Sequence, residues 1–133
     1  MLPPHHHPRA DNFVVLTASN PNASVDTYMI QENDAPVIKQ NLQPLQMTIF
    51  PRGSLHTMVN TGCGNVQLVS SLNAENAGTL NAANNFYRLN DQIIGTVLGA
   101  TGSQLNATMN NIPAIGTGSN AGSAECLSKC GLS

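Results

Sequence analysis

The sequence predicts an all-β fold, a sandwich or barrel, because three features of residues 12–73 agree. Apolar residues either alternate with polar ones or form short runs, as they do in half-buried and buried strands. Clusters of Gly, Asn, Pro and Asp separate these runs at intervals of roughly ten residues. The chain has 133 residues, of which 41% are hydrophobic, and this is enough for one domain with a core.

Six strands follow in order from this pattern. Each is an apolar or alternating run that ends at a turn signal such as Ser-Asn-Pro-Asn, Glu-Asn-Asp or Pro-Arg-Gly. The predicted strands are Asn12–Ala18, Asp26–Glu32, Pro36–Leu42, Gln46–Pro51, Ser54–Asn60 and Asn65–Asn73.

Helical periodicity replaces alternation after residue 73. Ala77–Asn85 and Asp91–Leu98 are predicted helices, and the second has an N-cap residue at either Asn90 or Asp91.

The C-terminal part has a different composition. Residues 99–123 are rich in Gly, Ser, Thr and Asn, which indicates a flexible linker or tail, and a short helical turn follows at Ala124–Cys130. The expected organisation is therefore one β domain over residues 1–98 and a tail with a Cys-containing helix over residues 99–133.

The charge pattern excludes two classes of partner. Only 9% of the residues are charged, against roughly 25% in typical soluble domains, and the net charge of -2 includes no basic run. Nucleic acid and membrane surfaces are therefore not expected partners. The chain also lacks a Ser-His-Asp elbow, a lysine-containing phosphate loop and a paired Cys-x-x-Cys zinc pattern.

An extracellular location is expected from the neutral, Asn-rich and Lys-poor composition, although no signal peptide follows Met1. The cysteines are Cys63, Cys126 and Cys130, and an odd number in a secreted chain points to a partner outside it or to missing sequence. Cys126 and Cys130 share one face of a short helix, so a local bridge between them is compatible with the spacing but not required.

The four histidines are the main candidates for chemistry. His5 and His7 share one face of a strand while His6 points to the other, and His56 lies in the middle of an apolar strand. Neutral imidazoles in such an arrangement suit a transition metal site inside a barrel. The simpler interpretations are a tag remnant at residues 5–7 and a core histidine satisfied by hydrogen bonds at His56.

Three stretches, in this order, resemble motifs of the germin-like and spherulin-like cupins. HHHPRADN at residues 5–12 is similar to the motif in which His-x-His-Pro-Arg-Ala precedes a glutamate. IFPRGSLHTMVN at residues 49–60 is similar to the strand-turn-strand motif that carries the last histidine. SLNAENAGTL at residues 71–80 resembles the exit into the C-terminal helices. The resemblance is nearest to the secreted spherulin-like cupins of fungi.

The resemblance implies a cupin jelly-roll β-barrel with short C-terminal helices and a metal held by His5, His7, Asn12 and His56. Asn12 stands where the family has its glutamate ligand, so the expected site has three neutral histidines and no carboxylate. Two alternatives remain: Asp11 supplies the carboxylate, or the site has no fourth protein ligand.

The family implies manganese, whereas a site without a carboxylate suits Cu, Zn, Fe or Ni better. A metal-dependent oxidoreductase of the germin type, acting on oxalate or superoxide, is one expectation. A non-catalytic storage, stress or cell-wall protein is another, and a metal-free carbohydrate- or ligand-binding domain is a third. Arg9 and Arg52 are either ligands for an anionic substrate or ordinary turn residues. The expected partners are a small molecule or metal alone, with a homo-oligomer left open.

The family has a secretion signal and several strands before its first histidine motif. We therefore expect a fragment of a longer protein, a barrel incomplete at its N-terminus, and a Cys63 that has lost its partner with the missing segment.

Overall fold

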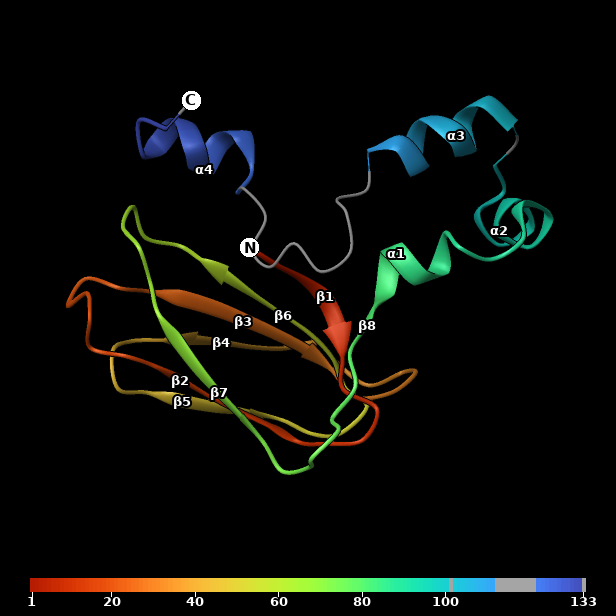
Figure 1. Ribbon diagram of the computed structural model, residues 1–133. Coiled ribbons are helices and arrows are strands. Elements are labelled where there is room, and N and C mark those ends of the chain that lie inside the picture. The colour runs from red at the N-terminus through yellow and green to blue at the C-terminus, as the bar shows by residue number, and fades with distance from the viewer. Residues whose placement is uncertain (101, 112–121, 133) are drawn as a thin grey trace.

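The computed structural model describes residues 1–100, 102–111 and 122–132. In these ranges the chain forms two facing antiparallel sheets followed by short helices (Figure 1). The strands are β1 (Leu2–His6), β2 (Asn12–Leu16), β3 (Val25–Ile30), β4 (Ile38–Leu42), β5 (Met47–Phe50), β6 (Leu55–Asn60), β7 (Leu68–Leu72) and β8 (Leu80–Asn81). The all-β prediction is confirmed, and so are all six predicted strands, with shorter ends.

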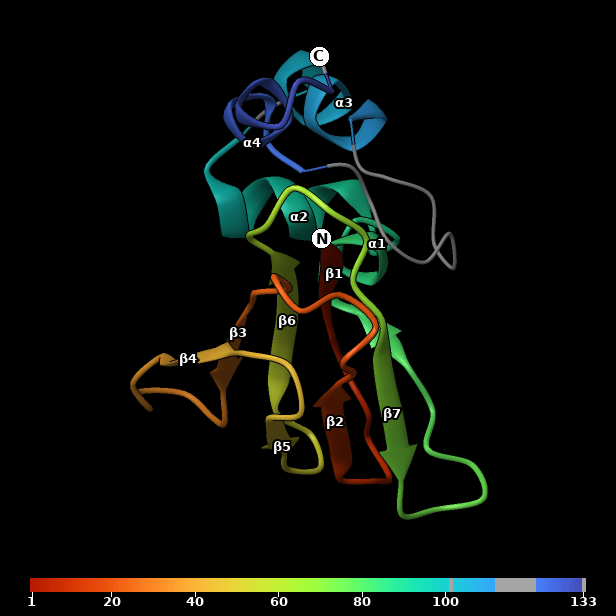
Figure 2. The same ribbon diagram turned by 90° about the vertical axis from the view of Figure 1, so that its left-hand side faces the viewer.

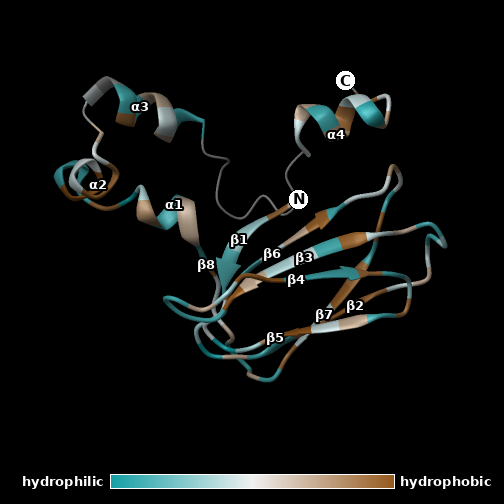
Figure 3. Ribbon diagram, turned by 180° about the vertical axis from the view of Figure 1, so that it is seen from behind, coloured by the Kyte–Doolittle hydropathy of each residue, from teal (hydrophilic) through white to brown (hydrophobic). Residues whose placement is uncertain are grey.

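The two sheets enclose the core. One sheet has the strand order β4-β3-β6-β1-β8 and the other has the order β5-β2-β7. Figure 3 shows hydrophobic and hydrophilic residues interspersed along the strands, as expected when one face of a sheet is buried. The core between the sheets consists of Val14, Leu16, Ala23, Val25, Met29, Leu42, Phe50 and Met58.

The described residues also form four helices, which lie on one side of the sheets, with the last one apart from the other three (Figure 1 and Figure 2). They are α1 (Ala82–Phe86), α2 (Asp91–Leu98), α3 (Gly102–Asn110) and α4 (Ala124–Lys129). The predicted bounds of α2 are confirmed, and the side chain of Asn90 caps it by accepting a hydrogen bond from the Gln92 N–H. None of the helices in the described part of the chain is long and apolar enough to cross a membrane.

Two predictions about the helical region are wrong. The helix predicted from residue 77 begins only at Ala82, because Gly78 has a φ of +69° and Leu80–Asn81 pair with β1 instead. Residues 102–110 form α3 rather than a flexible linker, and Leu105 is buried there. Residues 112–121 of the predicted linker lie outside the described residues.

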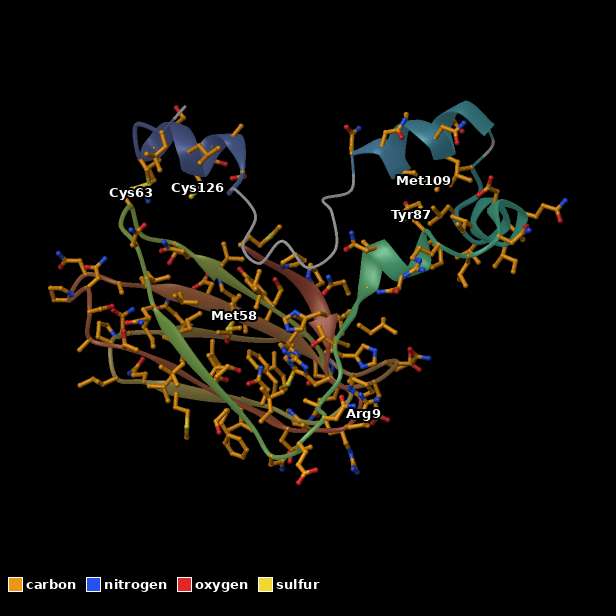
Figure 4. The ribbon with its side chains drawn as sticks, in the orientation of Figure 1. Arg9, Met58, Cys63, Tyr87, Met109 and Cys126 are labelled. Atoms are coloured by element: carbon orange, nitrogen blue, oxygen red, sulfur yellow. A yellow bond between two sulfur atoms is a disulfide. The ribbon has the colours of Figure 1, made fainter. Side chains whose placement is uncertain are left out.

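The disulfide connects the predicted β domain to the C-terminal helix. Cys63, in the loop after β6, is bonded to Cys130 at the end of α4, and Cys126 is a free thiol (Figure 4). The expectation that Cys63 has lost its partner is therefore wrong. Cys126 and Cys130 lie on the same helix, but Cys130 is bonded across 67 residues of sequence rather than locally.

We expect peptide mapping under non-reducing conditions to recover the Cys63–Cys130 bond and an alkylated Cys126. The substitution Cys63→Ser should lower the free energy of unfolding by about 2–4 kcal/mol, because the bond closes a long loop. Urea unfolding measures this loss, with Cys126→Ser as the matched control. An equal loss in both variants would contradict the assigned pairing.

Candidate metal centre

Strands β1 and β6 bring the predicted histidines together. His5 is the register partner of His56, so these two side chains lie side by side in one sheet. His7 follows the end of β1 and returns to the same face, and the three histidines have ligand atoms within 4.8 Å of one another. His6 does not join them, as the alternation of a strand predicts.

The rings are packed closely. The ring centroids of His5 and His56 are 4.4 Å apart, and His7 lies 5.2 Å from His5 and 5.5 Å from His56. His5 and His56 are only 6% and 2% exposed, whereas His7 is half-buried. One ion could therefore be reached by all three rings, with His7 on the solvent side.

Each ring is oriented by a backbone carbonyl. Nδ1 donates to the Pro3 carbonyl in His5, to the Gly78 carbonyl in His7 and to the Ser54 carbonyl in His56, at 2.7, 2.6 and 2.9 Å. A carbonyl only accepts, so the proton of each neutral ring sits on Nδ1. Nε2 then carries the free lone pair, which is the arrangement that metal-binding histidines use.

Burial keeps the rings of His5 and His56 neutral. Desolvation, with a smaller contribution from the neighbouring histidines, lowers the pKa of His56 to about 4, although the Ser54 carbonyl opposes this. Desolvation also lowers the pKa of His5, with a smaller contribution from His7 in the same direction. Neutral imidazole is the form that binds metal, so these rings are ready to do so without losing a proton.

In metal-free protein, His56 is expected to make folding less favourable as the pH falls from about 6.5 to about 4. Its pKa is 6.5 when unperturbed and about 4 in the fold, so the unfolded chain binds the proton first. The stabilisation is complete above pH 6.5 and declines towards pH 4 by about 3 kcal/mol.

Urea unfolding in a chelator at about pH 7.5 and about pH 4.5 measures this change. The variant His56→Gln removes the larger of the two contributions and should leave only the smaller pH dependence that comes from His5, whereas His6→Gln should retain both. A pH dependence that survives His56→Gln unchanged would contradict the assignment to His56.

The residues present fit a metal ion. His56 Nε2 is buried and has no hydrogen-bond partner, and a buried polar atom left unpaired costs about 1–3 kcal/mol. The Phe50 ring stacks on His56 with centroids 4.1 Å apart and contributes no polar group. A cation bound at Nε2 would satisfy this atom, and the three neutral nitrogens match the ligands that transition metals prefer.

The side chain of Asn12 is already engaged in a hydrogen bond. It is 2% exposed at the start of β2 and is the register partner of Phe50, whose ring covers His56. Its Oδ1 accepts a hydrogen bond from the Ser70 hydroxyl. The side chain is neutral, so the site has no carboxylate at the position where the resemblance implies one.

Asp11 lies outside the cluster, on the surface. Its carboxylate accepts from the Arg52 N–H and from Asn73 Nδ2, both at 2.8 Å, and these bonds lower its pKa. Arg9 and Arg52 line a surface pocket with Asp11. The three charged residues named as candidates from the sequence therefore lie together at this pocket.

Sequence reasoning missed the carbonyl groups of Pro3, Ser54 and Gly78, which orient the histidines. A carbonyl is present in every residue and has no sequence signature. Gly78 alone gave a signal, since glycine is favoured at its positive φ.

No family model matches the chain, but curated relatives and solved structures do. Spherulin-1A of Physarum polycephalum is 27% identical over 134 residues, which cover 98% of this chain and 50% of that protein. Germin-like protein subfamily 1 member 20 of Arabidopsis thaliana is 29% identical over 107 residues, covering 80% of this chain and 47% of that protein. The structure of an oxalate oxidase superimposes with a TM-score of 0.73 at 18% identity, covering 81% of this chain and 55% of that one.

The two facing sheets define a cupin jelly roll. The three clustered histidines resemble a metal site. The similarity to Spherulin-1A extends over nearly the whole chain, and the similarity to the germin-like protein extends over four fifths of it. The chain is thus similar to the spherulin- and germin-like cupins, at 27–29% identity. It spans about half the length of the curated relatives it matches.

Proposed function

We propose that this chain is part of a secreted cupin metalloprotein that binds one divalent transition metal ion through His5, His7 and His56. The observation that carries the proposal is the set of three Nδ1–carbonyl hydrogen bonds, which leaves Nε2 free on each ring. The unpartnered, buried Nε2 of His56 supports it independently.

Secretion is supported by the Cys63–Cys130 disulfide, because such bonds persist in oxidising compartments. The low content of charged residues in the chain agrees with this location.

The identity of the metal depends on Asn12. Manganese follows from the resemblance to germins, but Mn(II) prefers oxygen and carboxylate ligands. Three imidazoles beside a neutral amide favour Cu, Zn, Fe or Ni instead. The proposal includes Asn12 beside the ion, and the stacking of its strand neighbour Phe50 on His56 supports this.

Asn12→Glu is expected to raise the affinity for Mn(II) by about tenfold or more relative to Zn(II), because it adds a charged oxygen ligand. Asn12→Gln has nearly the same size and no charge, so it should not shift the preference. Calorimetric titration of both ions into the two variants measures the ratio. Equal ratios in the variants would remove Asn12 from the site.

An oxidoreductase of the germin type is the enzymatic version of the proposal, with oxalate or superoxide as substrates to test. Three protein ligands leave coordination positions open, and a bound ion would supply Lewis-acid or one-electron chemistry there. The chain's own histidines hold the site neutral, so an anionic substrate would meet no repelling carboxylate in the cluster.

A non-catalytic storage, stress or cell-wall protein is the second candidate. One observation favours it: among the described residues, no Asp or Glu joins the histidine cluster to act as acid or base.

Metal analysis of purified protein, together with oxalate and superoxide assays, tests these alternatives. Stoichiometric metal that is lost in His56→Ala, together with turnover, supports the enzyme. Metal without turnover supports the non-catalytic protein. A folded protein that takes up none of Mn, Fe, Cu, Ni or Zn would overturn the metalloprotein proposal.

A further inference from the structure

Two charged residues that follow the first histidine motif, Arg9 and Asp11, hold the loops whose carbonyls orient the metal-facing rings. We propose that Arg9 and Asp11 are positioning residues of the histidine cluster, acting through the backbone at Gly78 and Ser54. This inference rests on the proposed metal site and assigns a role to Asp11 other than that of a ligand.

Arg9 binds the loop between β7 and β8. Its Nε donates to the Asn76 carbonyl and its Nη2 donates to Asn76 Oδ1, both at 2.7 Å. Its own backbone N–H donates to the Ala77 carbonyl at 3.2 Å. Three bonds from one residue therefore fix two consecutive peptides of this loop, and Figure 4 shows Arg9 beside the chain that leads into β8.

The guanidinium also lies directly against Gly78. A Cβ atom on Gly78 would be 2.6 Å from Arg9 Nη2 and 3.1 Å from Pro8 Cγ, so only glycine allows this contact. The φ of +69° at Gly78 points to the same requirement. The carbonyl of this glycine accepts the Nδ1 proton of His7 at 2.6 Å, so Arg9 fixes the group that orients His7.

Asp11 connects the same loop to the turn that precedes His56. One carboxylate oxygen accepts from the Arg52 N–H, and the other accepts from Asn73 Nδ2. The Asp11 N–H in turn donates to Asn73 Oδ1 at 2.9 Å. A single side chain thus joins the start of the β7–β8 loop to the turn after β5.

The turn held by Asp11 ends at Ser54. The Ser54 N–H donates to the Pro51 carbonyl at 3.0 Å, and the Gly53 N–H donates to the His7 carbonyl at 2.9 Å. The Ser54 carbonyl accepts the Nδ1 proton of His56. Asp11 therefore acts on His56 through this turn, as Arg9 acts on His7 through Gly78.

Because of where these contacts lie, their effect on the orientation of the ligands can be distinguished from their effect on global stability. Arg9 is exposed, Asp11 is partly exposed, and both lie outside the core, so their bonds contribute little to global stability. Groups that orient metal ligands nevertheless change metal affinity by about 10–100-fold when they are removed. A positioning role thus predicts a large effect on metal binding with a small effect on unfolding.

The test uses Arg9→Gln and Asp11→Ala, with Arg88→Gln and Glu125→Ala as controls that remove the same charges from exposed sites in the helical region. Co(II) affinity is measured by chelator competition, and the visible absorption of bound Co(II) reports ligand geometry. In the metal-free proteins, NMR measures how fast the Nδ1 protons of the histidines exchange with water. Asp11→Asn keeps one acceptor oxygen and serves as a milder second variant.

We expect Arg9→Gln to lower Co(II) affinity about 10–100-fold, change the Co(II) absorption and speed exchange of the His7 proton. Asp11→Ala should do the same and act mainly on the His56 proton, with Asp11→Asn intermediate. Both variants should unfold within a few degrees of their controls. If affinity and exchange match the controls, the proposal is overturned.

A wild-type protein that binds no Co(II) would count against the metal site itself. The exchange rates in metal-free protein would still decide between a positioning role for Arg9 and Asp11 and none.

Discussion

Replacing His56 by alanine is expected to lower the affinity for Zn(II) or Co(II) by about 100-fold or more. Loss of a ligand must cost at least as much as the loss of a group that only orients one. A 100-fold change corresponds to about 2.8 kcal/mol of binding free energy. Competition with a chelator of known affinity measures it.

The matched control is His6→Ala. His6 lies between His5 and His7 in the sequence, but it is not part of the cluster, and its Nδ1 has no hydrogen-bond partner to lose. The affinity of His6→Ala for Zn(II) or Co(II) should stay close to that of the wild type. His7→Ala, at a half-buried position, provides a second ligand variant if His56→Ala does not fold. Equal losses in His6→Ala and His56→Ala would show that the cluster is not the binding site.

Phe50→Ala is expected to destabilise the protein by about 3–5 kcal/mol, as large-to-small changes of buried aromatic residues do. Phe50 is 1% exposed, belongs to the core between the sheets and stacks on the His56 ring at 4.1 Å. The substitution would leave a cavity beside the His56 ring. A domain stable by about 5–15 kcal/mol would retain only part of its folding free energy.

Phe13→Ala is the control for this prediction. Phe13 lies on the neighbouring strand β2 but is only half-buried, because it alternates with the inward-facing Asn12 and Val14. It should lose clearly less stability than Phe50→Ala. Urea unfolding of both variants gives the comparison, and similar losses would mean that the inner face of this sheet is not the core.

Much of the fold could be predicted because it depends on local patterns. The alternation in Asn12–Leu16 follows from the pleat of a strand, which sends successive side chains to opposite faces. The same rule placed His5 and His7 together and His6 apart. The bounds of α2 were predictable since Asn90 caps one end and Gly99, at a φ of +63°, ends the other.

Other parts depended on contacts between distant residues. The disulfide could not be predicted because the sequence allows three pairings, and only the fold brings Cys63 to Cys130. The start of α1 was misplaced because Leu80 and Asn81 are drawn into β8 by pairing with His5 and His6. No local propensity contains this information.

The candidate site divides in the same way. Its three histidines are chemical groups with a recognisable spacing, and the motifs around them resemble those of the germin-like and spherulin-like cupins. Their geometry depends on backbone carbonyls at Pro3, Ser54 and Gly78, which any residue type supplies and which only folding brings to the rings.

The chemistry of the candidate ligands and the alternation of residues along the strands can thus be predicted from the sequence, because side-chain chemistry and the pleat are local properties. The pairing of His5 with His56, the closure of Cys63 on Cys130 and the surface position of Asp11 come from the tertiary structure. These depend on which segments pack together, and packing is a property of the whole chain.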